Sequence, residues 1–268
     1  MNENNQSQID TIISAISLIN TSLSIPVFLP ISNKNIQIRQ LTTAQEKRLV
    51  KNITVNDQDT VIPSIFPILQ DCIETKDIDL MSLPIPDVYA ILIKLRIFSI
   101  GQKLSLLVPS KNKGKKQDRI TININLNDIY KQFIEKFKKF KKEEITIQDD
   151  PYVFVLSVPT LKDFMNTAER SDDTTFMDTI SEELYRLIKT ISIVSGEEKK
   201  TINMSNFTIE EKNKILDNIP NRSLIKIINE SNDFIKTITD LLLFDVEVDG
   251  EHYSHRLNVI SPDFFTRF

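Results

Sequence analysis

Hydrophobic residues three and four positions apart define the first element that the sequence predicts. Between residues 7 and 23 they follow the spacing of an amphipathic helix, and we take Ile12, Ile16 and Ile19 as its candidate partner contacts. The next stretch, SIPVFLPIS, contains two prolines and predicts an extended connector. The helix either packs on its own chain, which is the interpretation we favour, or projects toward a partner.

The second element begins where the hydrophobic period changes. Residues 36–39 alternate between apolar and polar side chains, as in a half-buried strand. Thr42 then lies three residues before Gln45, the spacing of a capping box, in which two side chains satisfy free N–H groups at a helix start. Such a strand-to-helix turn could belong to an active site or serve as a structural joint.

The next predicted helix should begin with Ser64 as its N-cap. The most apolar predicted helix comes after it and covers residues 83–101. Its prolines stand at the start, and Gly101 follows where a left-handed residue ends many helices. Because it is apolar over most of its circumference, it should form the buried centre of the fold. Lys94 and Arg96 must reach the surface or a carboxylate, since an unpaired buried charge is costly.

An alternating strand and an aromatic helix follow in the middle of the chain. Residues 120–126 alternate, and we pair this strand with the one at residues 36–39. In the next helix, Phe133, Phe137 and Phe140 share one face, and lysines cover the other. This aromatic face is either turned to the core or docks a partner, and we keep its three phenylalanines as partner-contact candidates.

The C-terminal half alternates between strand and helix signals. PYVFVLSVPTL predicts a strand, and helices should start at Leu161, at Ser181 (ending at Gly196) and at Thr208, where Glu211 completes a second capping box. A further amphipathic helix covers SLIKIINESNDFIKTI, and the tail reads as a hairpin around DGEH.

Together these elements predict an α+β fold, predominantly helical, with a few short antiparallel strands and a C-terminal β-hairpin. We divide the chain into three regions. Residues 1–30 hold the N-terminal amphipathic helix and connector, 31–150 a strand-plus-helix core, and 151–268 a mainly helical region that ends in the hairpin.

Composition narrows the possible functions without choosing one. The chain has 268 residues, of which 40% are hydrophobic, and a formal net charge of −4, so it can bury a core and lacks an overall basic character. One cysteine allows no internal disulfide and fits a reducing compartment. We expect no secretory signal and no membrane span, because the apolar runs are too short.

The sequence contains no recognisable motif for catalysis, phosphate binding or metal binding. The four glycines are too far apart for a phosphate-binding loop. Cys72, among Ile68, Leu69 and Ile73, reads as a buried structural thiol rather than a nucleophile. His252 and His255 lie close in sequence, but residues three apart in a strand face opposite sides. We therefore predict no catalytic residue, no cofactor, no metal and no small-molecule substrate.

Lysine-rich segments raise one alternative from another functional class. Residues 111–116 and the helix segment KFKKFKK could form a nucleic-acid-binding module, with phosphate contacts and stacked aromatic rings. The helical spacing of the phenylalanines places them in one stripe, however, and we disfavour nucleic acid as the partner.

Several segments, taken in order, resemble one known family. They are IQIRQLTTAQEKRLV, FPILQDCI, LPIPDVYAILIKLRIFSIGQ, ITININL, VLSVPTLKDF, NFTIEEKNKILDNIPNRSLIKIINESNDFI and ISPDFF. They are similar to the T-even-type bacteriophage baseplate hub assembly proteins, from about Ile31 to the end of the chain. Some relatives carry a cysteine-rich hairpin before the terminal phenylalanines. Here the corresponding segment, LFDVEVDGEHY, has no cysteine, so no metal is carried over.

The resemblance implies a non-enzymatic structural or assembly protein of the contractile-tail baseplate hub. Its partners would be other hub, wedge and tail-tube proteins, either in the virion or in the host cytoplasm during assembly. The chain could remain in the particle or act as a chaperone that leaves. In this setting the turn at Thr42 reads as a joint. Phe264, Phe265 and Phe268 are further partner-contact candidates, with packing onto the body as the alternative.

Overall fold

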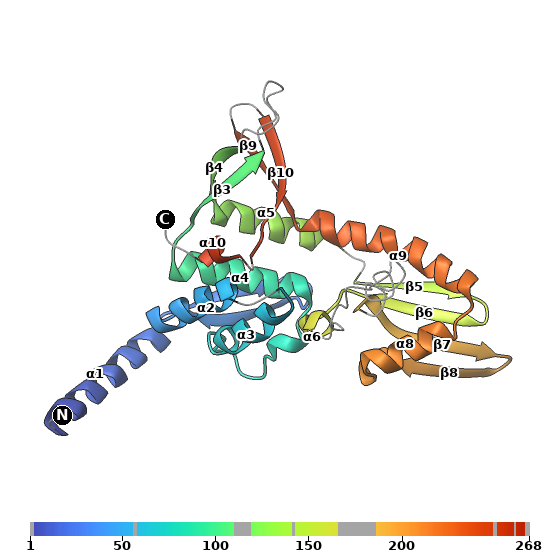
Figure 1. Ribbon diagram of the computed structural model, residues 1–268, viewed down its shortest axis with the longest axis horizontal. Coiled ribbons are helices and arrows are strands. Elements are labelled where there is room, and N and C mark those ends of the chain that lie inside the picture. Colours follow the sequence, from blue (N-terminus) through green and yellow to red (C-terminus); the bar gives the residue numbers. More distant parts are fainter. Residues whose placement is uncertain are drawn as a thin grey trace.

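The computed structural model describes residues 3–55, 58–109, 119–140, 143–165, 186–248, 251–259 and 261–265. Helices and small antiparallel sheets alternate along the chain (Figure 1). Helix α1 (Glu3–Ser22) extends from one side of a central body, and a four-stranded sheet lies at the other side (Figure 1). The predicted α+β class and the C-terminal hairpin are confirmed.

The first sheet is a hairpin, and the sequence predicted only its second strand. Strand β1 (Ser24–Leu29) pairs antiparallel with β2 (Lys34–Arg39), so the predicted connector is a strand. Its Pro26 is tolerated because this two-stranded sheet leaves one side of β1 without a strand partner. The predicted pairing of residues 36–39 with 120–126 is wrong, since β4 (Arg119–Asn125) pairs with β3 (Lys103–Pro109).

Two helices follow the first hairpin. Helix α2 (Thr43–Val55) begins with the predicted capping box: the Gln45 N–H donates to Thr42 Oγ1 (3.2 Å), and the Thr42 N–H donates to Gln45 Oε1 (3.0 Å). Helix α3 (Gln58–Gln70) begins before Ser64, so the prediction that Ser64 caps its start is wrong. The helix contains two prolines. Burial of its apolar face, including Ile65, outweighs the hydrogen bonds that prolines remove from a helix.

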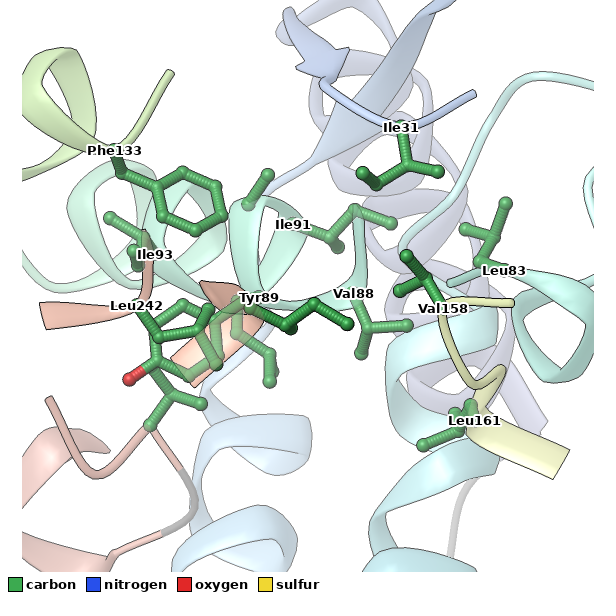
Figure 2. Close-up of a cluster of buried hydrophobic side chains, with 14 of the residues drawn as sticks. Ile31, Leu83, Val88, Tyr89, Ile91, Ile93, Phe133, Val158, Leu161 and Leu242 are labelled. Carbon is green, nitrogen blue, oxygen red and sulfur yellow. The ribbon is translucent and has the colours of Figure 1, made fainter. Parts of the chain in front are cut away.

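Helix α4 (Ile85–Ser99) is the buried centre, as predicted. Figure 2 shows its side chains between Phe133 on one side and Leu83, Val158 and Leu161 on the other. The rings of Tyr89 and Phe133 lie with their centroids 5.7 Å apart. Burial on nearly every side explains why this helix is apolar around its circumference.

Two buried charges on α4 tie distant segments to it. The Asp87 carboxylate accepts hydrogen bonds from the N–H groups of Ile31 (2.8 Å) and Ser32 (3.0 Å) and from the Ser32 hydroxyl (2.5 Å). Arg96 is only 4% exposed, so its guanidinium does not reach the surface, and it donates to three backbone carbonyls. Lys94 is half-buried, with Nζ 4.4 Å from the centroid of the Tyr130 ring.

A four-stranded antiparallel sheet forms the second part of the molecule. Its strands β5 (Glu144–Asp149), β6 (Tyr152–Ser157), β7 (Ile188–Ser195) and β8 (Glu198–Asn203) are neighbours in chain order. Position 150, where we divided the chain, lies in the turn between β5 and β6, so this sheet contains residues from both sides of the division.

The predicted helix from Ser181 to Gly196 is wrong for residues 188–195, which form β7. Residues 181–185 lie outside the described part of the chain. Pairing with β6 and β8 provides backbone hydrogen bonds on both sides of β7, which suit its β-branched residues better than a helix does.

Two helices lead back from this sheet to the central body. Helix α8 (Ile209–Asp217) starts at the Thr208–Glu211 capping box, which is confirmed, and α9 (Asn221–Leu241) follows Pro220. Figure 1 shows α9 running from the four-stranded sheet to α5 (Leu126–Lys139). Hairpin β9 (Leu243–Val248) and β10 (Glu251–Arg256) comes next, and α6 (Leu161–Met165) and α10 (Pro262–Phe265) are single short turns.

Candidate partner-binding surface

Helix α1 presents its apolar face to solvent. Ile12, Ile16 and Ile19 are 59%, 51% and 59% exposed, and every described side chain from residue 7 to residue 16 is exposed. Figure 1 shows α1 leading away from the rest of the molecule. The interpretation that we favoured, in which this helix packs on its own chain, is therefore wrong.

The same face contains further apolar residues that we did not name as partner contacts from the sequence. Ile9, Ile13 and Leu23 are each about as exposed as the three candidates. The signal that identifies them is the helical spacing that predicted the helix. With them, α1 carries a continuous apolar face along most of its length.

The base of α1 is attached firmly to the body. Leu23 alone separates α1 from β1, whose Val27 and Leu29 are completely buried. The helix therefore emerges from a strand that the core holds in place.

The aromatic face of α5 is turned inward. Phe133 and Phe137 are 4% and 2% exposed, and the centroids of their rings lie 4.8 Å apart. Phe140 is partly exposed, with its ring centroid 6.0 Å from that of Phe137. The structure thus places two of these three candidates in the chain's own core, which is the packing alternative.

The C-terminal phenylalanines also lie against the body. Phe264 and Phe265 are essentially buried, and α10, which contains them, contacts α2. The Phe264 carbonyl accepts a hydrogen bond from Arg96 Nε at 2.5 Å. Phe268 lies outside the described residues.

Contacts within the chain engage two lysines of α5. Lys136 Nζ donates to the Leu243 carbonyl (2.7 Å) and lies 3.7 Å from the Asp245 carboxylate. Lys138 Nζ lies 5.7 Å from the centroid of the Phe28 ring. Lys136 is therefore partly engaged within the chain, whereas Lys138 and the neighbouring Lys139 are exposed. The other lysine-rich segment, residues 111–116, lies outside the described residues.

Comparison with known proteins decides the family. Residues 22–255 match the family described as T4 bacteriophage base plate protein, over most of the chain. The chain belongs to this base plate family. The predicted resemblance is confirmed, and the membership supports a structural role in the phage tail baseplate. No curated protein and no solved structure matches the chain.

The match to the family leaves out nearly all of the first helix of the base plate protein. It begins at residue 22, the last residue of α1, and ends within β10. The part that resembles the family therefore includes the central body and the four-stranded sheet, whereas nearly all of α1 precedes it.

Burial perturbs two proton-bearing side chains in the described part of the base plate protein. Burial raises the pKa of the Cys72 thiol to about 11, so this thiol is protonated at neutral pH and is a poor nucleophile. Burial also raises the pKa of the Tyr130 hydroxyl to about 12, and this hydroxyl donates to the Phe28 carbonyl (3.3 Å). These groups belong to the packing of the base plate protein.

One hollow on the described surface is lined mainly by apolar side chains. A cavity of about 250 Å³ lies among apolar side chains, Thr239, Arg186 and Arg256. Its described lining contains no carboxylate, histidine or thiol. Within the described ranges no cluster of three or more metal-ligating side chains occurs. None of the helices described here has the length and apolar character needed to cross a bilayer.

Proposed function

We propose that this base plate protein is a non-enzymatic structural or assembly component of the baseplate hub, acting through protein–protein contacts. The observation that carries the proposal is the exposed isoleucine face of α1 on a body that buries its own core. Exposed apolar faces of this kind mark sites of protein association. The partners would be other hub, wedge or tail-tube proteins.

The arrangement of the body supports a contact role over a catalytic one. Four of the aromatic side chains that could have formed a second docking surface are buried in the fold: Phe133, Phe137, Phe264 and Phe265. That leaves α1 as the main apolar surface of the described chain that is free to be covered by another molecule.

The proposal is tested in phage particles. We expect mass spectrometry to detect the chain in stalled baseplate intermediates, and we expect Ile12→Lys with Ile16→Lys to remove it from them. Ser14→Lys places one such positive charge on the opposite face of α1 and should leave the chain in place. Absence of the unaltered chain from all baseplate intermediates would overturn the proposal.

The same measurement separates two versions of the role. A chain found in both intermediates and finished virions is a hub subunit. A chain found only in intermediates is an assembly chaperone that leaves.

A further inference from the structure

The apolar residues of α1 follow a heptad repeat. Their spacing alternates between three and four residues at Ile9, Ile12, Ile16 and Ile19, and Leu23, the first residue after the helix, continues it. This period of 3.5 residues is the period of the a and d positions in a left-handed coiled coil. The positions extend over two heptads and begin a third, and all five side chains are exposed.

The composition of α1 gives it little intrinsic tendency to be helical by itself. Isoleucine, serine, asparagine and threonine make up most of the segment, and each forms helices less readily than alanine or leucine. Glu3 and Asp10 are its only charged residues, so no pair of opposite charges can support the helix. A helix of 20 residues with this sequence depends on burying its apolar face.

The residues beside the apolar face of α1 allow it to pack against identical helices. The positions that flank a heptad seam, e and g, are occupied here by Gln8, Ile13, Ala15, Asn20 and Ser22. None carries a charge, so copies of α1 meet without repulsion between like charges. Asp10 falls at position b, on the outer side of the assembled helices.

The residues of the seam also favour more than two helices. Isoleucine at both a and d favours three or four helices over two. Ile13 at position e widens the apolar face, as an assembly of more than two helices requires.

Outside α1, the exposed large hydrophobic side chains of the described residues form no second continuous apolar face. The other large hydrophobic side chains exposed in the described ranges are scattered over separate elements, at Val55, Leu107, Ile193 and Ile225. Self-association through α1 is then a contact of α1 with α1, and such a contact closes with rotational symmetry.

We propose that three copies of this chain associate through a parallel coiled coil formed by α1. The inference deepens the proposed function, because it rests on α1 being the docking element and names its partner. Three identical helices related by a threefold axis must run parallel. Because α1 leads away from the body, its seam is accessible to two other copies (Figure 1).

Sedimentation equilibrium of the full chain tests the assembly. We expect a mass three times the 30.9 kDa of one chain, and a single-chain mass for Ile12→Lys with Ile16→Lys. Ser14→Lys, at the outermost position f, should retain the threefold mass. Urea unfolding of the body should be the same in all three proteins, which excludes misfolding as the cause. A single-chain, twofold or fourfold mass for the unaltered protein would overturn the inference.

A cross-linking experiment tests the parallel direction. In a parallel coil, identical a positions face one another, so diamide should oxidise two Ile16→Cys thiols to an interchain disulfide while being reduced to the hydrazine. Ser14→Cys, on the outer side, should cross-link far less. Cys72 is buried and should not contribute. Equal cross-linking of the two variants would overturn the parallel coil.

The two proposals fail in different ways. If the purified chain is monomeric but the isoleucine substitutions still remove it from baseplate intermediates, α1 binds another protein and the trimer is overturned. If the purified chain is trimeric but absent from the intermediates, the trimer stands and the hub role is overturned.

Discussion

Arg96 Nε donates a hydrogen bond to the backbone carbonyl of Phe264, 2.5 Å away and 168 residues later in the chain. The same guanidinium donates to the carbonyls of Gly101 and Lys103. Arginine suits this position because its planar group offers five N–H donors and has no acceptor to satisfy. Through it the central helix holds both its own C-terminal end and the C-terminal turn of the fold.

Replacement of Arg96 by methionine should therefore destabilise the protein strongly. Three carbonyls would lose a donor in a buried place, and we expect a loss of about 3 kcal/mol in the free energy of unfolding. Urea denaturation measures it. Arg48→Met removes an exposed guanidinium from α2 and should change that free energy by less than about 0.5 kcal/mol. Equal effects of the two substitutions would contradict the role of Arg96.

The capping box at the start of α2 gives a second, smaller prediction. Thr42→Ala removes the oxygen that accepts from the Gln45 N–H, and should lower the free energy of unfolding by about 1 kcal/mol. Thr42→Ser keeps that oxygen and should be close to neutral. Thr43→Ala, one residue later and exposed, serves as the control.

The cap also tests whether this turn is a joint. If it only sets the angle between β2 and α2, Thr42→Ala should assemble into baseplates whenever it is folded. A large loss of assembly by a folded Thr42→Ala variant would show that the turn itself contacts a partner.

Local chemistry predicted part of this fold correctly. The capping boxes at Thr42 and Thr208 form because their partners lie three residues away, within reach of any chain that starts a helix there. Helix α4 was recognisable because an apolar circumference has few outcomes other than burial.

The errors arose where distant residues decide the outcome. The stretch forming β7 has apolar spacing that suits a helix, but β6, more than 30 residues earlier, pairs with it as a strand. The partners of Arg96 include a carbonyl 168 residues away, which no local pattern encodes. For α1, amphipathic spacing predicts a helix with one apolar face but does not say whose surface covers it.

Because of Cys72, the free energy of unfolding should fall as the pH rises into the alkaline range. Its folded-state pKa is raised by burial to about 11, whereas an unfolded thiol ionises near pH 9. Its contribution is fully present below pH 9 and is lost as the pH rises through 11, a change of about 3 kcal/mol. Unfolding free energies measured across this window should fall by about that much more for the unaltered protein than for Cys72→Ala. Parallel pH curves would contradict the burial of this thiol.

Asp87 should be required for the turn between β1 and β2 to keep its position on α4. Asp87→Asn replaces one carboxylate oxygen with an amide that cannot accept from Ile31 or Ser32, and we expect a loss of about 2 kcal/mol in unfolding free energy. Asp87→Ala, which removes both acceptors, should lose more. Asp240→Asn, on an exposed position of α9, is the control and should be nearly neutral in the same urea titration.

The phenylalanine face of α5 distinguishes a core role from a docking role. Phe137 is buried between the rings of Phe133 and Phe140, so Phe137→Ala should lower the free energy of unfolding by about 3–5 kcal/mol in the purified chain. Phe140→Ala, one turn away and partly exposed, should lower it by about 1 kcal/mol. Urea denaturation of both variants measures the difference. A docking face would give the opposite result: Phe137→Ala would keep its stability and fail only when baseplate partners are added, because a side chain reserved for a partner contributes nothing to the isolated fold.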